Sequence, residues 1–126
     1  MSLVLDAGAW IALDRHDRAM WRRLKVAQMA GEIPRSHGGV IGQVWRGRGA
    51  RHALLAQALA GAEVRPLDQR LGRAAGELLA VTRGRDVIDA ALVLLADDGD
   101  QIVTSDPDDI ARLAAASGRH LEVVRA

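Results

Sequence analysis

Two aspartates follow short runs of residues that have the composition of buried strands. Asp6 follows residues 3–5, and Asp106 follows residues 101–104 after one serine. In an open parallel sheet, ligands bind just beyond the carboxyl ends of the strands, at the point where the strand order reverses. We therefore expect both carboxylates at one edge of a sheet, where they could act on a ligand. Asp6 could instead cap a turn or a helix, and the sequence leaves both interpretations open.

A second pair of acids, Asp86 and Asp89, opens an apolar helix that we expect over residues 86–96. Their spacing of three residues places both on one face of that helix, near the positive end of its dipole. Asp86 is equally a candidate for the helix N-cap. Asp89 has a weaker structural explanation, because it adjoins a run of small and apolar residues that should be buried.

Carboxylates that converge on one point repel one another, so a cluster of them is stable mainly when a cation neutralises it. The chain has no cysteine, and its four histidines show no metal-ligand spacing. Oxygen ligands favour Mg²⁺ or Mn²⁺ over Zn²⁺. A divalent ion held by carboxylates can activate water and stabilise the charge that develops on a phosphate. Such a site would have the groups needed for phosphodiester hydrolysis.

The elements that must position these acids follow from the alternation of short apolar runs with longer amphipathic ones. Strands are expected at residues 3–5, 32–34, 63–67, 101–104 and 121–124. Helices are expected from residue 14 or 17 to about residue 30, and over residues 36–46, 54–61, 68–84, 86–96 and 106–118, with a small-residue turn at 7–9. Strands that alternate with helices imply parallel pairing. The fold class is therefore α/β, a three-layer sandwich around a central parallel sheet of about five short strands.

Composition excludes several classes of function. The length of 126 residues fits one domain over residues 1–126. A formal net charge of +1 argues against a strongly basic nucleic-acid coat, and the absence of Tyr and Phe argues against an aromatic stacking platform. No apolar stretch approaches the roughly 18 residues of a membrane-spanning helix, and the N-terminus lacks the basic region of a signal peptide. A soluble, cytoplasmic chain without a membrane partner is expected.

The chain resembles the PIN domain family in three segments: LVLDAGAWIAL near the N-terminus, DVIDAALVLLA, and IVTSDPDDIARL near the C-terminus. In size and layout it is similar to the VapC-like toxin ribonucleases of type II toxin–antitoxin systems, and the resemblance runs from Leu3 to Val124. It implies a PIN-like parallel sheet flanked by helices, and Mg²⁺- or Mn²⁺-dependent endoribonuclease activity on RNA. It also implies a cognate antitoxin and a homodimer as partners.

Carried over residue by residue, the resemblance assigns an acidic site. Asp6 matches the first acid of the family, and Asp106 matches the fourth. Asp89 matches the third, with Asp86 as a close second candidate. Asp109 matches an acidic position that some members use instead of the fourth acid or beside it. All five are thereby implied as metal ligands, and Asp6, Asp89 and Asp106 as catalytic residues.

The resemblance also implies supporting residues and shows one departure. Thr104 and Ser105 are implied as supporting hydroxyls at the substrate. Gln43 stands where the family usually has a Glu as its second acid, so it keeps a carbonyl oxygen as a neutral ligand but lacks the charge. Two functions follow: an endoribonuclease in which Gln43 assists, or a weakened or inactive PIN-like module that binds RNA or an antitoxin.

The basic stretch over residues 45–52 is a candidate substrate contact. Arg46 and Arg48 could hold an RNA phosphate, because guanidinium groups match phosphate oxygens. For Arg51 and His52 the sequence slightly favours a solvated helix end.

Overall fold

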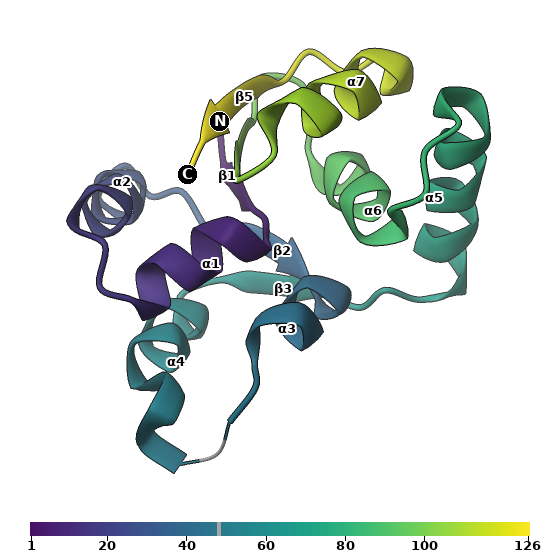
Figure 1. The fold of residues 1–126 in the computed structure, drawn as a ribbon. Helices are drawn as coiled ribbons and strands as arrows, with labels where there is room; N and C mark the ends of the chain where they lie inside the picture. The colour runs from purple at the N-terminus through teal and green to yellow at the C-terminus, as the bar shows by residue number, and fades with distance from the viewer. Residues whose placement is uncertain (48) are drawn as a thin grey trace.

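The computed structural model describes residues 1–47 and 49–126, and a sheet of five parallel strands lies at its centre (Figure 1). The strands are β1 (Leu3–Leu5), β2 (Arg35–His37), β3 (Glu63–Arg65), β4 (Gln101–Thr104) and β5 (Glu122–Arg125). They lie in the order β3-β2-β1-β4-β5, and every neighbouring pair is parallel. The predicted α/β class and the number of strands are confirmed.

Helices connect these strands and cover both faces of the sheet. They are α1 (Ala7–Asp14), α2 (Arg18–Met29), α3 (Gly38–Val44), α4 (Ala53–Ala60), α5 (Gln69–Thr82), α6 (Val87–Leu95) and α7 (Pro107–Ser117), with a short 3₁₀ helix η1 (Gly49–His52) before α4. Figure 1 shows α1, α2 and α4 on one side of the strands and α5, α6 and α7 on the other, which gives three layers. Across residues 1–47 and 49–126, no helix has both the length and the apolar character needed to span a bilayer.

The middle strands β1 and β4 carry the core. Leu3, Val4, Leu5, Ile102 and Val103 are all at most 3% exposed. Both α1 and α6 contact β1, so that strand is covered from its two faces. A strand covered on both faces is rich in apolar side chains, which is why these two strands could be predicted from the sequence.

Helix α1 forms where the sequence predicted a turn at residues 7–9. It starts at Ala7, directly after Asp6, whose side chain accepts a hydrogen bond from the N–H of Ala9 and caps the helix. Apolar residues occur on every side of α1, so it lacks the alternation of polar and apolar residues by which an amphipathic helix is recognised. The prediction of a turn was therefore wrong, and Asp6 is a cap as well as a candidate site residue.

Strand β2 lies just beyond its predicted position at residues 32–34. It forms instead at Arg35–His37, where all three side chains are polar. Ser36 is buried, and its hydroxyl donates a hydrogen bond to the carbonyl of Leu5 over 3.0 Å. Because distant neighbours satisfy these polar groups, the strand has no apolar pattern of its own. Ser36 is part of the strand, and His37 caps α3 in its place.

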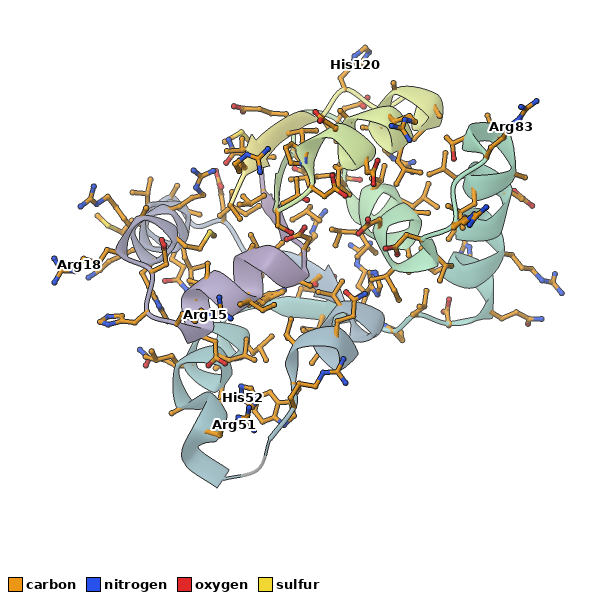
Figure 2. The ribbon with its side chains drawn as sticks, in the orientation of Figure 1. Arg15, Arg18, Arg51, His52, Arg83 and His120 are labelled. Atoms are coloured by element: carbon orange, nitrogen blue, oxygen red, sulfur yellow. The ribbon has the colours of Figure 1, made fainter. Side chains whose placement is uncertain are left out.

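Several smaller boundaries also differ from prediction. Strand β3 ends at Arg65, β5 runs one residue later than expected, and α5 ends at Thr82. The residue after α5, Arg83, adopts a left-handed conformation with φ of 57°. Figure 2 shows Arg83 projecting from the outer end of this helix.

Candidate functional site

The strand order reverses between β1 and β4. The chain runs from β1 to β2 and β3 on one side, and then returns to place β4 on the other side of β1. The two strands are parallel, with Leu5 opposite Val103, so both end at the same edge of the sheet. Ligands of open parallel sheets bind at such a switch point. The topology thus brings Asp6 and Asp106 to one edge, as the sequence predicted.

Asp6 is held at this edge by three hydrogen bonds. Its Oδ2 accepts from the hydroxyl of Thr104 over 2.6 Å and from the N–H of Ser105 over 3.0 Å. Its Oδ1 accepts from the N–H of Ala9 over 3.0 Å. The carboxylate is only 6% exposed. These donors come from both sides of the switch point, and they fix the orientation of the carboxylate.

Thr104 links the ends of the two middle strands. While its hydroxyl donates to Asp6, its Oγ1 accepts the N–H of Asp106 over 2.9 Å. Ser105, predicted as a supporting hydroxyl, contacts Asp6 through its backbone N–H. Of the two residues, only Thr104 bonds to Asp6 through a hydroxyl in the described contacts.

Asp89 lies among the other predicted acids. Burial and the nearby negative charges, with that of Asp86 the largest, raise the pKa of Asp89 to about 7. Asp6, Asp106 and Asp109 contribute in the same direction. Four carboxylates therefore act on Asp89 at this edge. We call Asp6, Asp86, Asp89, Asp106 and Asp109 the acidic cluster.

Asp86 and Asp89 have different environments. Asp86 is exposed and caps α6, because its Oδ1 accepts the N–H of Asp89 over 3.0 Å. The side chain of Asp89 is half-buried on the side where the other acids act on it. The structural role that the sequence offered for Asp86 is present, and Asp89 is the stronger candidate for the third acid.

Asp106 and Asp109 lie on the first turn of α7 and are both exposed. A hydrogen bond to Asp106 and the charge of that residue raise the pKa of Asp109. An ion pair joins Oδ1 of Asp109 to Nη2 of Arg112 over 3.5 Å. Exposed carboxylates at a helix start can change rotamer at low cost, so these two acids can adjust their positions around a ligand.

The donor set fits a hard divalent cation. It consists of carboxylates and one hydroxyl, and such a cation would offset the mutual repulsion of the acids. As the side chains stand, no three His, Asp or Glu residues in the described part of the chain are close enough together to hold one ion. Metal binding would therefore need the exposed acids of α7 to turn toward Asp6 and Asp89.

A cavity of about 210 Å³ opens beside the acidic cluster. Helices α5, α6 and α7 surround it, and Asp89 and Asp109 line the side next to the cluster. Leu79 and Leu113 provide apolar surface, and Arg112 provides a positive charge. Arg85 and Asp86 also line it, so the cavity combines an apolar side with both acidic and basic groups.

Gln43 and the predicted arginines are not joined to the acids by any described contact. Gln43 is exposed on α3, and its backbone carbonyl oxygen accepts a hydrogen bond from Nε of Arg46 over 3.2 Å. Arg46 is exposed and follows this helix. Arg48, the second predicted phosphate contact, lies outside the described residues. The roles proposed for these three side chains remain predictions.

His52 is buried, contrary to the prediction of a solvated helix end. It is 6% exposed, and its Nδ1 lies 2.7 Å from Oδ2 of Asp14. Its Nε2 accepts the N–H of Arg46 over 3.0 Å, and its ring packs against that of Trp45. Figure 2 shows His52 between the start of α4 and the chain that leaves α3. It anchors this loop.

The number and spacing of the acids at residues 97–100 suggest a solvated turn, and Asp97 and Asp98 are exposed as such a turn requires, whereas Asp100 is buried. Asp100 is 4% exposed and accepts the N–H groups of Ser2 over 2.8 Å and of Asp97 over 2.9 Å. It closes the connection between α6 and β4 at the edge of the sheet opposite the acidic cluster, and so has a structural role.

Two residues near the acidic cluster were not singled out by the sequence. A Cβ on Gly8 would lie 2.5 Å from both Cβ and Oγ of Ser105, so glycine allows α1 to approach the loop after β4. His37 is fully buried and bonded through both ring nitrogens. The small residues around Gly8 were visible in the sequence. Nothing in the spacing of His37 pointed to its contacts.

Comparison with known proteins shows a similarity of fold. No family model matches the sequence, and no curated protein matches it. A chain in the crystal structure of VapBC2 from Rickettsia felis bound to a DNA fragment from their promoter matches with a TM-score of 0.71. The match covers 98% of each chain at 14% sequence identity. This chain therefore has a VapBC-related fold.

Proposed function

We propose that the chain is a metal-dependent endoribonuclease and the toxin of a VapBC-like toxin–antitoxin pair. The observation that carries the proposal is the placement of Asp6 and Asp106 at the switch point, with a half-buried Asp89 whose pKa their charges help to raise to about 7. Carboxylates that destabilise one another at a ligand-binding edge are typical of a functional site. The fold shared with a chain of VapBC2 supports the same assignment.

Asp6, Asp89 and Asp106 would hold Mg²⁺ or Mn²⁺ at this edge. When bound, such an ion lowers the pKa of water and stabilises the negative charge that develops on a phosphate during hydrolysis. Asp6 contributes a carboxylate that its three hydrogen bonds already orient. Thr104 keeps the backbone of Asp106 next to Asp6, so the two acids stay together.

The substrate would be RNA, and the partner a cognate antitoxin. Arg46 would contact a substrate phosphate, as its guanidinium suits that group. Arg112, which lines the cavity beside the acids, would attract a nucleotide next to the scissile bond. A homodimer in the cytoplasm is part of the same proposal, and it follows from the family that the sequence resembles.

Incubation of the purified chain with a mixture of structured RNAs tests the proposed activity. We expect cleavage in Mn²⁺ or Mg²⁺ and none after chelation by EDTA, because carboxylates alone do not activate water at this site. Readdition of Mn²⁺ should restore cleavage, which controls for irreversible loss of structure. A chain that remains folded and cleaves none of the RNAs at any Mn²⁺ concentration would contradict the endoribonuclease.

A second candidate function, a weakened or non-catalytic binding module, is favoured by Gln43. This residue supplies no charge, and no ready-made set of three ligands exists among the described side chains. A module of this kind would bind RNA or an antitoxin peptide without cleaving RNA.

Replacement of Gln43 by glutamate separates the two candidates. We expect Gln43→Glu to raise the affinity for Mn²⁺ and the cleavage rate by about tenfold, since one added charge at a hard-cation site strengthens metal binding. Calorimetry and a cleavage time course would measure both quantities. Gln43→Ala serves as the control, because it removes the amide without adding charge. If native protein is inactive and Gln43→Glu is active, the binding module is the correct function.

A further inference from the structure

We propose that His37 is a positioning residue of the acidic cluster: its ring joins the start of α3 to the first turn of α6 and so holds Asp89 in place. The part of this proposal that concerns metal affinity rests on the proposed function. The part that concerns the position of α6 does not depend on it.

The hydrogen bonds of His37 define one tautomer. Its Nε2 lies 2.9 Å from the carbonyl oxygen of Ile88, which can only accept, so Nε2 carries the proton. Its Nδ1 accepts the N–H of Gly39 over 3.1 Å and is therefore unprotonated. The side chain is fully buried. A neutral ring with a fixed tautomer thus connects the end of β2, the start of α3 and the first turn of α6.

The electrostatic surroundings keep this ring neutral. Burial lowers the pKa of His37, against smaller opposite effects of the bond to Ile88 and of the charge of Asp86. A second proton would sit on Nδ1 and remove the acceptor that Gly39 uses. The neutral form is therefore the one that can make both bonds.

Close packing supports the same junction. A Cβ on Gly39 would lie 2.5 Å from Cδ1 of Ile88 and 2.9 Å from Cε1 of His37. A larger residue at position 39 would have to displace the side chain of Ile88 or the ring of His37, and β2 and α6 are also in contact. The bond from Nε2 of His37 to the carbonyl of Ile88 adds a polar link between β2 and the first turn of α6, and loss of the ring would remove that link.

The bond between His37 and Ile88 bears on the acidic cluster through the next residue, Asp89. Asp89 follows Ile88 directly, and the negative charges of Asp6, Asp86 and Asp106 act on it. Like charges repel one another, so an ionised Asp89 would favour a movement of the first turn of α6 away from the other acids. The bond from His37 to the carbonyl just before Asp89 opposes that movement. A buried neutral group therefore keeps a repelled carboxylate within reach of its partners.

Two variants separate this role from simple helix capping. In His37→Asn, the short side chain can still accept the N–H of Gly39, as asparagine is a good N-cap, but it does not reach Ile88. In His37→Gln, the longer amide can donate to the carbonyl of Ile88 but leaves the cap of α3 unmade. His120→Asn is a matched control, because His120 is exposed and far from this junction.

The first readout is amide hydrogen exchange at Asp89 and Ala90 in metal-free protein, and the second is Mn²⁺ affinity by calorimetry. We expect His37→Asn to speed exchange and weaken Mn²⁺ binding about tenfold each, while His37→Gln stays within about threefold of wild type. If His37 acted only as the cap of α3, His37→Gln should have the larger effect on exchange and on Mn²⁺ affinity, and His37→Asn the smaller. His120→Asn should leave both quantities unchanged.

The proposal is overturned if α6 exchanges in His37→Asn as it does in wild type, or if His37→Gln loses as much protection as His37→Asn. Failure of the proposed function looks different. Wild type would then bind no Mn²⁺ and cleave no RNA, while His37→Asn would still loosen the first turn of α6. That result would support the positioning role and reject the metal-dependent nuclease.

Discussion

Replacing Asp6 by asparagine is expected to lower RNA cleavage by at least about a thousandfold, equivalent to about 4 kcal/mol of transition-state stabilisation. Asp6 is the buried member of the acidic cluster, and it receives three hydrogen bonds that aim its carboxylate. Asparagine has almost the same shape but no charge for a metal. Cleavage of RNA in Mn²⁺ and Mn²⁺ affinity by calorimetry would measure the loss, and both should fall together.

The same substitution should also cost about 1–3 kcal/mol of stability, because an amide –NH₂ must face one of the donors that now bond to the carboxylate. Asp14→Asn provides a matched control. Asp14 also bonds to a backbone N–H, that of Leu55, and to the ring of His52, but it lies outside the acidic cluster. The control should lose stability and keep its cleavage rate. If Asp6→Asn retained more than a tenth of wild-type cleavage, Asp6 would not be a metal ligand.

The centre of the fold could be predicted because it is buried on both faces. Residues 3–5 are apolar throughout, and Ile102 and Val103 form the apolar centre of residues 101–104, so the positions of both strands and of the acids that follow them could be predicted from the sequence. Parallel pairing then places Asp6 and Asp106 at one edge, whatever the details of the flanking helices. Asp89 could be singled out in a similar way, because an acid in the first turn of an otherwise apolar, buried helix is unusual.

The sequence was uninformative where polar groups are satisfied by distant partners. Strand β2 has no apolar residue. Its buried polar side chains are satisfied from elsewhere in the chain, because Ser36 bonds to the carbonyl of Leu5 and His37 to that of Ile88. Helix α1 is apolar on every side and so shows no periodicity. The close approach at Gly8 depends on a loop almost a hundred residues away along the chain, at Ser105. These features arise from tertiary contacts, and no local pattern encodes them.

The mutual repulsion of the acidic cluster should be measurable as lost stability at high pH. Asp89 has a pKa of about 7 in the folded chain, raised from an ordinary value of 3.8 by burial and by the neighbouring acids. The folded state therefore holds a proton that the unfolded state releases between these two values. Stability from this group is full below pH 4, falls as the pH rises to about 7, and is then constant.

Asp89→Asn removes this pH dependence, because asparagine resembles the protonated acid at every pH. We expect the variant to gain about 1–2 kcal/mol over wild type between pH 5 and pH 8, after allowance for the solvent that screens a half-buried group. Urea unfolding of both proteins at the two pH values would measure the gain. The substitution Asp108→Asn, at an exposed residue in the first turn of α7, should show no such change with pH and controls for charge removal in general.

A divalent cation should reverse the order of stability of wild type and Asp89→Asn. Wild type at pH 8 has an ionised Asp89 that a cation can neutralise, so Mg²⁺ in the millimolar range should raise its free energy of unfolding by about 1–3 kcal/mol. Asp89→Asn lacks that charge and should gain far less from Mg²⁺, while losing most RNA cleavage. The variant would then be the more stable protein without metal and the less active one with it, which is the trade-off expected when a site is destabilised for the sake of its ligand. Equal stabilisation of both proteins by Mg²⁺ would place the cation elsewhere on the chain.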